Sequence, residues 1–216
     1  MVNFIGNIGV NHNADLKAIK TLIKLGAEAG FNYLKFNTCD TIDFDMFEIH
    51  EIFNYAEELN ITLFCSINNV ITADIIYQYT DICEIPLEKN TDKEFINYIR
   101  SKFKNIIFSI DNIELDYLEN LYYSYGPQMF LFNACEKNCN TKSIQKFLLL
   151  NNVKFCFKYE CENLIPHIVS LTNGCEFIER NITLCKELKG DNHKNSLEPH
   201  EYNDFINKLQ YANSLC

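Results

Sequence analysis

Polar side chains follow short apolar segments at many places in this sequence of 216 residues. They are Asn11, His12, Lys35, Ser66, Glu84, Ser109, Cys135, Glu160, Glu179 and Asn181. A lysine after such a segment holds a phosphate or carboxylate as a point charge, or is a surface group with a buried stem. Carboxylates and imidazoles handle protons. Their chemistry depends on whether the chain brings these side chains together.

Eight apolar segments alternate with longer amphipathic stretches, the pattern of parallel strands joined by crossover helices. The segments predicted to be strands are 3–10, 32–38, 61–67, 82–87, 105–111, 128–134, 153–159 and 175–183. We expect helices to begin at Asp15, Asp45, Thr72, Thr91, Asn112, Thr141, Glu162 and Glu198. Several of these residues have side chains that accept hydrogen bonds from the free amides of a first helical turn.

Eight such units in a chain of this length predict an α/β protein with a (β/α)8 TIM barrel. We expect one domain over residues 1–216 with short loops. A doubly wound sheet is the alternative, and it is disfavoured because no glycine-rich phosphate-binding turn follows the first segment. In a barrel, chemistry occurs at the carboxyl ends of the strands. The ten polar residues named above would therefore share one site.

Composition limits the function classes. The hydrophobic fraction of 47% and the charged fraction of 22% are typical of a globular protein. A net charge of −10 argues against nucleic acid or an anionic membrane as a partner, although a local basic pocket could still bind an anionic substrate. No apolar run reaches the ~20 residues of a membrane helix, so we expect a cytoplasmic protein. Most of the ten cysteines lie in apolar runs and are predicted to be reduced core residues.

Two separated stretches resemble one known family. Asn7-Ile8-Gly9-Val10-Asn11-His12-Asn13-Ala14 with Leu34-Lys35-Phe36-Asn37 is similar to Glu-Ile-Gly-x-Asn-His-Asn-Gly and Val-Lys-Phe-Gln of the sialic acid synthase (NeuB-type) family. Near the other end, residues 177–184 and 190–199 resemble its Ile-Glu-Lys-His-Phe-Thr-Leu and Gly-Pro-Asp-His-Lys-Ala-Ser-Leu-Glu-Pro. The resemblance implies a (β/α)8 barrel that condenses phosphoenolpyruvate with an N-acetylated amino sugar in surface-glycan biosynthesis. The family's C-terminal antifreeze-like domain is not expected in residues 1–216, and a homodimer is left as an option.

The resemblance also implies roles for individual residues. Lys35 and Glu179 match the positions expected to be catalytic, with Lys35 on the substrate anion and Glu179 on the sugar. Ser66 and Ser109 match positions near the anion. The remaining expected substrate contacts are His12, Asn37, His193 and Lys194. For His12 the alternative is a structural ring that bonds to loop backbone, and for His193 it is a cap on the last helix.

The sequence departs from the family pattern at positions that matter for chemistry. The two metal-binding histidines are replaced by Glu160 and Asn181, whose oxygen atoms would form a weaker and less selective site for Mn²⁺ or Mg²⁺. Asn7 replaces an acid on the first strand, and Glu84 replaces a lysine on the fourth. The alternative function is therefore a catalytically degenerate relative that binds a sugar or a protein partner.

Overall fold

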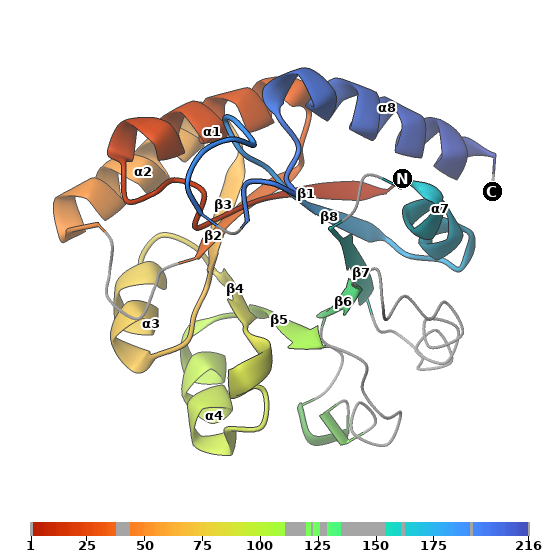
Figure 1. Cartoon of the computed structure of the whole chain (residues 1–216). Helices are drawn as coiled ribbons and strands as arrows, with labels where there is room; N and C mark the ends of the chain where they lie inside the picture. The colour runs from red at the N-terminus through yellow and green to blue at the C-terminus, as the bar shows by residue number, and fades with distance from the viewer. Residues whose placement is uncertain are drawn as a thin grey trace.

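The strands of the computed structural model form a closed parallel barrel in chain order, β1 to β8, with β8 paired to β1 (Figure 1). The described residues are 2–37, 44–110, 120–121, 123–125, 129–134 (backbone only), 154–160, 163–190 and 192–215. The strands are β1 (Asn3–Gly9), β2 (Tyr33–Asn37), β3 (Thr62–Ser66), β4 (Ile82–Ile85), β5 (Asn105–Ile110), β6 (Met129–Ala134), β7 (Lys154–Tyr159) and β8 (Phe177–Asn181). The predicted α/β class and parallel strand order are confirmed.

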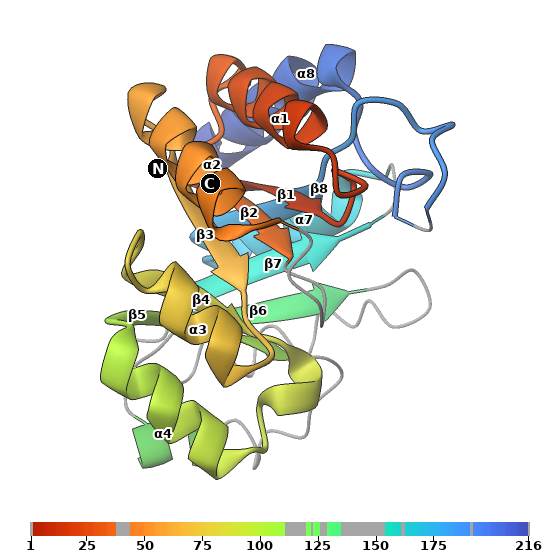
Figure 2. The same cartoon turned by 90° about the vertical axis from the view of Figure 1, so that its left-hand side faces the viewer.

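Helices cover the outside of the barrel (Figures 1 and 2). They are α1 (Leu16–Ala29), α2 (Met46–Glu58), α3 (Val70–Ile76), α4 (Lys93–Lys102), α7 (Ile165–Thr172) and α8 (Pro199–Ser214), with a short 3₁₀ helix η1 (Leu87–Lys89) after β4. The helix starts predicted at Asn112, Thr141 and Glu162 lie outside the described residues. The described chain therefore shows the closed sheet and part of the expected helical layer.

Local capping explains where the helices begin. The Asp15 and Asp45 side chains each accept backbone N–H bonds from the first turn of α1 and α2, and Glu198 opens α8, all as predicted. The starts predicted at Thr72 and Thr91 are wrong by one to three residues. Asn69 caps α3 and Asp92 caps α4, because the side-chain Oδ1 of each accepts a hydrogen bond from the backbone N–H three residues further on.

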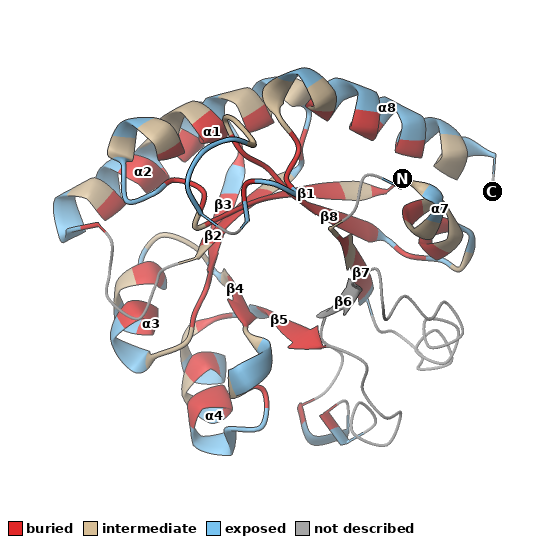
Figure 3. Ribbon diagram, viewed as in Figure 1, coloured by how far each residue is buried: buried red, intermediate tan, exposed pale blue. Residues whose placement is uncertain are grey.

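The barrel interior begins with an apolar layer. Ile5, Phe64, Ile107, Cys156 and Phe177 form one buried cluster, separate from the larger core between strands and helices. These residues belong to strands from all around the barrel, so they can meet only on its axis. Side chains alternate between the two faces of a strand, and their neighbours in sequence therefore point outward to the helices. Most described strand residues are buried, as Figure 3 shows.

The expectation of short loops is wrong for the connection between β8 and α8. The segment between β8 and α8 is long, and its described residues lie beside the loop between β1 and α1 (Figure 2). Its backbone pairs with β8 through the Leu197 N–H, which donates to the Asn181 carbonyl oxygen at 2.8 Å. The Asn11 amide on the loop after β1 donates to the Ile182 carbonyl oxygen and to Ser196 Oγ. These bonds satisfy polar groups of the long segment that would otherwise be buried without a partner.

The cysteine prediction is confirmed for the described core residues. Cys65, Cys83, Cys156 and Cys175 are buried thiols without a disulfide. Burial raises the pKa of each, to about 12 for Cys175, so these thiols are protonated at neutral pH. Among the described residues, no helix has the length and apolar character needed to cross a membrane.

Candidate functional site

A polar layer lies directly above the apolar layer of the barrel. Two positions beyond each inward apolar residue, the same face of the strand carries a polar side chain. The layer consists of Asn7, Lys35, Ser66, Glu84, Ser109, Lys158 and Glu179. All stand toward the carboxyl ends of their strands, the end of the barrel that we call the mouth. The structure thus brings together five of the ten polar residues first singled out in the sequence.

Lys35 is the centre of the polar layer. Its Nζ donates to both carboxylate oxygens of Glu179, at 2.8 and 2.9 Å, and to Glu84 Oε2. Only 2% of Lys35 is exposed, and Glu179 is fully buried. Burial by itself would lower the pKa of Lys35, but the negative charges of Glu179 and Glu84 outweigh it and raise this pKa. Lys35 is therefore a charged ammonium whose three donors are all used by protein carboxylates.

Glu84 is held by residues from three neighbouring strands. Its Oε1 accepts hydrogen bonds from Ser109 Oγ at 3.1 Å and from Ser66 Oγ at 3.5 Å, while Oε2 accepts from Lys35. Ser66 lies directly opposite Glu84 in the register of β3 and β4. We call Lys35 Nζ, Ser66 Oγ and Ser109 Oγ the anion cradle. The three residues predicted to hold a substrate anion thus surround one carboxylate of the protein itself.

A second lysine reaches the same group of carboxylates. Lys158 Nζ lies 3.5 Å from Glu179 Oε1 and 3.3 Å from Glu160 Oε1. The Glu160 side chain is 43% exposed and marks the solvent side of the mouth. Among the described residues, the two lysines face three carboxylates, so the mouth has an excess of one negative charge.

The positions that correspond to the family's metal ligands form a hydrogen-bonded chain. Asn7 Nδ2 donates to Asn181 Oδ1 at 2.7 Å, and Asn181 Nδ2 donates to Glu160 Oε1 at 3.2 Å. The same Glu160 oxygen also faces the Lys158 ammonium. A divalent cation needs oxygen ligands directed at it, whereas here an amide N–H and an ammonium point at the carboxylate. These residues, as arranged, do not fit a metal ion.

His12 lies in the loop after β1 and contacts backbone groups of that loop and of β2. Its Nδ1 accepts the Ala14 N–H at 3.0 Å, and its Nε2 is 3.5 Å from the Asn37 carbonyl oxygen. The ring packs against Phe44 and Phe36 and is 1% exposed. These contacts match the structural alternative for His12, and its substrate role stays a prediction.

Asn37 ends β2, on the same face of the strand as Lys35 and opposite Ser66 in register. Within the described part of the chain, its side-chain oxygen is buried without a hydrogen-bond partner. An unpaired buried acceptor costs ~1–3 kcal/mol, so a donor that reached this atom would gain a favourable hydrogen bond.

His193 joins two loops at the rim of the barrel. Its Nδ1 is 2.6 Å from Thr183 Oγ1, and its Nε2 is 3.3 Å from Asn13 Oδ1. Burial lowers the pKa of this imidazole. It does not cap α8, which Glu198 does, and Lys194 beside it is exposed. Substrate contacts by His193 and Lys194 stay predictions, and Cys135 lies outside the described residues.

His167 and Arg180 are buried polar residues that the sequence analysis missed as a pair. His167 is fully buried among the rings of Phe157, Tyr159 and Phe205. Burial and the nearby Arg180 charge lower its pKa to about 3. The Arg180 guanidinium donates to the Tyr159 carbonyl oxygen at 2.6 Å. Both residues lie outside the barrel wall, so they support the fold and do not reach the mouth. The available signal was an arginine next to Glu179 in a predicted strand, because neighbouring side chains point to opposite faces of a strand.

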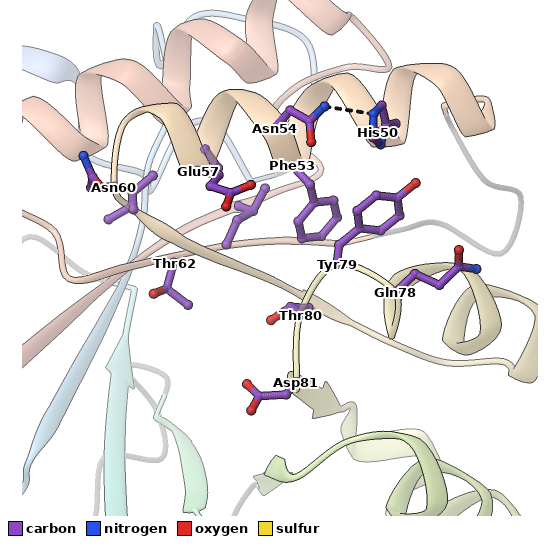
Figure 4. A pocket seen from close by; sticks show the side chains of 13 residues that line it. His50, Phe53, Asn54, Glu57, Asn60, Thr62, Gln78, Tyr79, Thr80 and Asp81 are labelled. Atoms are coloured by element: carbon purple, nitrogen blue, oxygen red, sulfur yellow. Dashed lines mark hydrogen bonds between the residues drawn. The ribbon is translucent and has the colours of Figure 1, made fainter.

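A hollow of about 690 Å³ lies at the opposite end of β3 and β4, under α2 (Figure 4). Stacked rings of Phe53 and Tyr79 form one wall, with 4.9 Å between their centroids, and His50 bonds to Asn54 nearby. None of the residues predicted to form the site lines it. Because barrel chemistry occurs at the carboxyl ends of strands, the mouth is the candidate site.

The fold and the mouth together define a class of protein: a parallel βα barrel with a buried polar layer at the carboxyl ends of its strands. Comparison with known proteins narrows the class. The NeuB family model matches residues 132–216. The N,N'-diacetyllegionaminic acid synthase of Campylobacter jejuni is 23% identical, over 91% of this chain and 72% of its own length. The human N-acetylneuraminate-9-phosphate synthase is 19% identical, over 95% and 68%.

Solved structures agree on the fold. The N-acetylneuraminic acid synthetase of Leptospira borgpetersenii superposes with a TM-score of 0.89 at 17% identity, covering 99% of this chain and 84% of its own. A spore coat polysaccharide biosynthesis protein of Bacillus subtilis gives 0.85 at 19% identity, covering 99% and 68%. The resemblance of this chain to the sialic acid synthase family is therefore confirmed.

Proposed function

We propose that this chain is a (β/α)8 barrel of the sialic acid synthase type that binds an amino sugar at its mouth in carbohydrate biosynthesis. One observation carries the proposal: the buried polar layer presents hydroxyl, amide and carboxylate groups while its described lysines are already paired with carboxylates. Such a surface suits a ligand rich in hydroxyl groups. The names of the relatives support a place in sugar biosynthesis.

Asn37 supports a sugar as the ligand. Its buried side-chain oxygen, which lacks a partner among the described residues, would accept a hydrogen bond from a hydroxyl or amide N–H of the sugar. Glu179 and Glu84 offer further acceptors near the same face of β2. An N-acetylated amino sugar brings several donors and no negative charge, and it would not compete with the carboxylates for Lys35.

Condensation of phosphoenolpyruvate with the sugar is the second candidate. The observation in its favour is that Lys35, Ser66 and Ser109 converge on a single carboxylate, as an anion-binding group would require. For this reaction the substrate anion has to take the place of the Glu84 carboxylate, and Glu179 would handle the sugar. The proposal needs no metal at Glu160 and Asn181. A cytoplasmic location and a homodimer remain parts of the same proposal.

Ligand binding separates the two candidates. We expect N-acetylmannosamine to raise the melting temperature of the purified chain, and phosphoenolpyruvate alone to leave it unchanged. Asn37→Ala should weaken sugar binding about tenfold in calorimetry, which corresponds to the loss of one hydrogen bond of ~1.4 kcal/mol. Asn54→Ala, in the hollow at the other end of the barrel, is the matched control and should bind normally.

Two results would decide against the first candidate. If no uncharged amino sugar shifts the melting temperature, the mouth does not bind this class of ligand. If phosphoenolpyruvate and N-acetylmannosamine together release inorganic phosphate with Mn²⁺ or Mg²⁺ present, the condensing reaction is correct.

A further inference from the structure

The Glu84 carboxylate has the surroundings of a bound anion. One ammonium and two hydroxyl groups donate to it, from β2, β3 and β5, while Glu84 itself comes from β4 between them. Lys35, Ser66, Glu84 and Ser109 are each at most 8% exposed. Charge-assisted bonds to a buried carboxylate are strong because little water competes for the donors.

The cradle exists independently of Glu84. Lys35 is also held by the two oxygen atoms of Glu179, so removing the Glu84 side chain leaves the ammonium in place. Ser66 ends β3 and Ser109 lies one residue before the end of β5, and both strands are held in register by backbone pairing with β4. Truncating Glu84 at Cβ would therefore leave a built site with the shape and donors for one carboxylate.

We propose that Glu84 is an internal anion that fills this cradle, and that it determines the charge of the ligand at the mouth. With Glu84 in place, the mouth takes an uncharged or cationic sugar and excludes carboxylate and phosphate ligands. Without Glu84, the cradle takes a small oxyanion from solution. This inference rests on the proposed function for the identity of the sugar, but the anion site itself does not depend on it.

Acetate provides a direct test, because its methyl carbon and carboxylate correspond to the two carbon and two oxygen atoms that Glu84→Ala removes. The full-length chain and its Glu84→Ala variant are compared by thermal unfolding in sodium acetate and in sodium chloride of the same ionic strength. With acetate at about ten times its dissociation constant, we expect the melting temperature of Glu84→Ala to rise by about 3–6 °C over chloride. The unmodified chain should show no difference between the two salts.

Two control variants exclude general salt effects. Glu84→Gln retains the volume of the side chain, so acetate cannot enter and the melting temperature should not respond. Glu51→Ala removes a carboxylate from an exposed pair with Lys20 and should be equally indifferent. Equal responses of Glu84→Ala and Glu51→Ala would overturn the inference, as would the absence of any acetate effect on Glu84→Ala.

The test remains decisive if Glu84→Ala does not fold in chloride. The variant is then refolded from urea in acetate and in chloride. Recovery of native circular dichroism only in acetate supports the inference, and failure in both salts overturns it. The outcome is separable from the proposed function: absence of sugar binding with acetate rescue present refutes only the sugar proposal. Sugar binding without rescue refutes only the role of Glu84.

Discussion

Replacing Lys35 by methionine tests whether the ammonium at the centre of the barrel holds the polar layer together. Methionine is unbranched like lysine but ends one atom short of the ammonium and has no charge, so Glu84 and Glu179 would be left close together without their shared partner. Removing one member of a buried ion pair costs ~3–5 kcal/mol, mainly because the remaining charges are uncompensated. For a chain of this size we expect the melting temperature to fall by about 6–20 °C.

The pH dependence distinguishes lost charge compensation from lost packing. In Lys35→Met, protonation of one carboxyl group removes the uncompensated charge, so the loss of stability should be smaller at pH 5 than at pH 7. In the unmodified chain, the raised pKa of folded Lys35 means that its stabilisation is complete below the unfolded lysine value of about 10.4 and decreases only above it. Between pH 6 and 9, Lys35 should therefore add no slope to the stability of the unmodified chain.

Urea unfolding followed by circular dichroism measures both effects. Lys20→Met, which breaks the exposed pair with Glu51, is the control and should cost less than about 1 kcal/mol. Combining Lys35→Met with Glu84→Gln should restore part of the loss, because one buried charge then disappears. The reasoning is refuted if Lys35→Met is as stable as the control at pH 7, or if its loss of stability is the same at pH 5.

Three further predictions concern the fold and the metal. Unfolded histidine takes up a proton near pH 6.5, but folded His167 does so only near pH 3, so acid favours the unfolded chain. Between pH 6.5 and 5 this proton uptake should lower the free energy of unfolding by ~2 kcal/mol, and His167→Phe should abolish that decrease in urea titrations. Gly6→Ala places a Cβ 2.7 Å from the buried Leu34 side chain. The free energy of unfolding, measured in urea, should therefore fall by ~1–3 kcal/mol, and adding Leu34→Val should recover part of this loss. An unchanged free energy of unfolding would contradict the packing. Mn²⁺ or Mg²⁺ should leave the melting temperature unchanged, since the oxygen atoms at Glu160 and Asn181 are already hydrogen-bonded, and a saturable rise would show that a metal site forms.

The positions of the described strands could be predicted from local pattern because each is a short apolar run between polar stretches. Helix starts were predictable where an Asp side chain stands directly before the helix, as at Asp15 and Asp45. The start of α3 was not, since Asn69 and Thr72 are both reasonable caps and only the hydrogen bond between them shows which one acts. A connection between residue 183 and Glu198 was predicted, but not how it folds, because its contacts come from residues near the other end of the chain, such as Asn11 and Asn13.

Sequence alone predicted parallel strands in barrel order, the carboxyl ends of the strands as the place of the polar residues, and the resemblance to the sialic acid synthases. Local periodicity and short motifs carry that information. The tertiary structure alone decided how the charges are paired. Glu84 and Glu179 lie 49 and 144 positions after Lys35 in the chain, yet the closed sheet turns all three side chains toward one axis. At that axis little water is present to solvate an ammonium, so Lys35 binds the nearest carboxylates. A residue that local sequence marks as a contact for a substrate anion thereby becomes the partner of two glutamates.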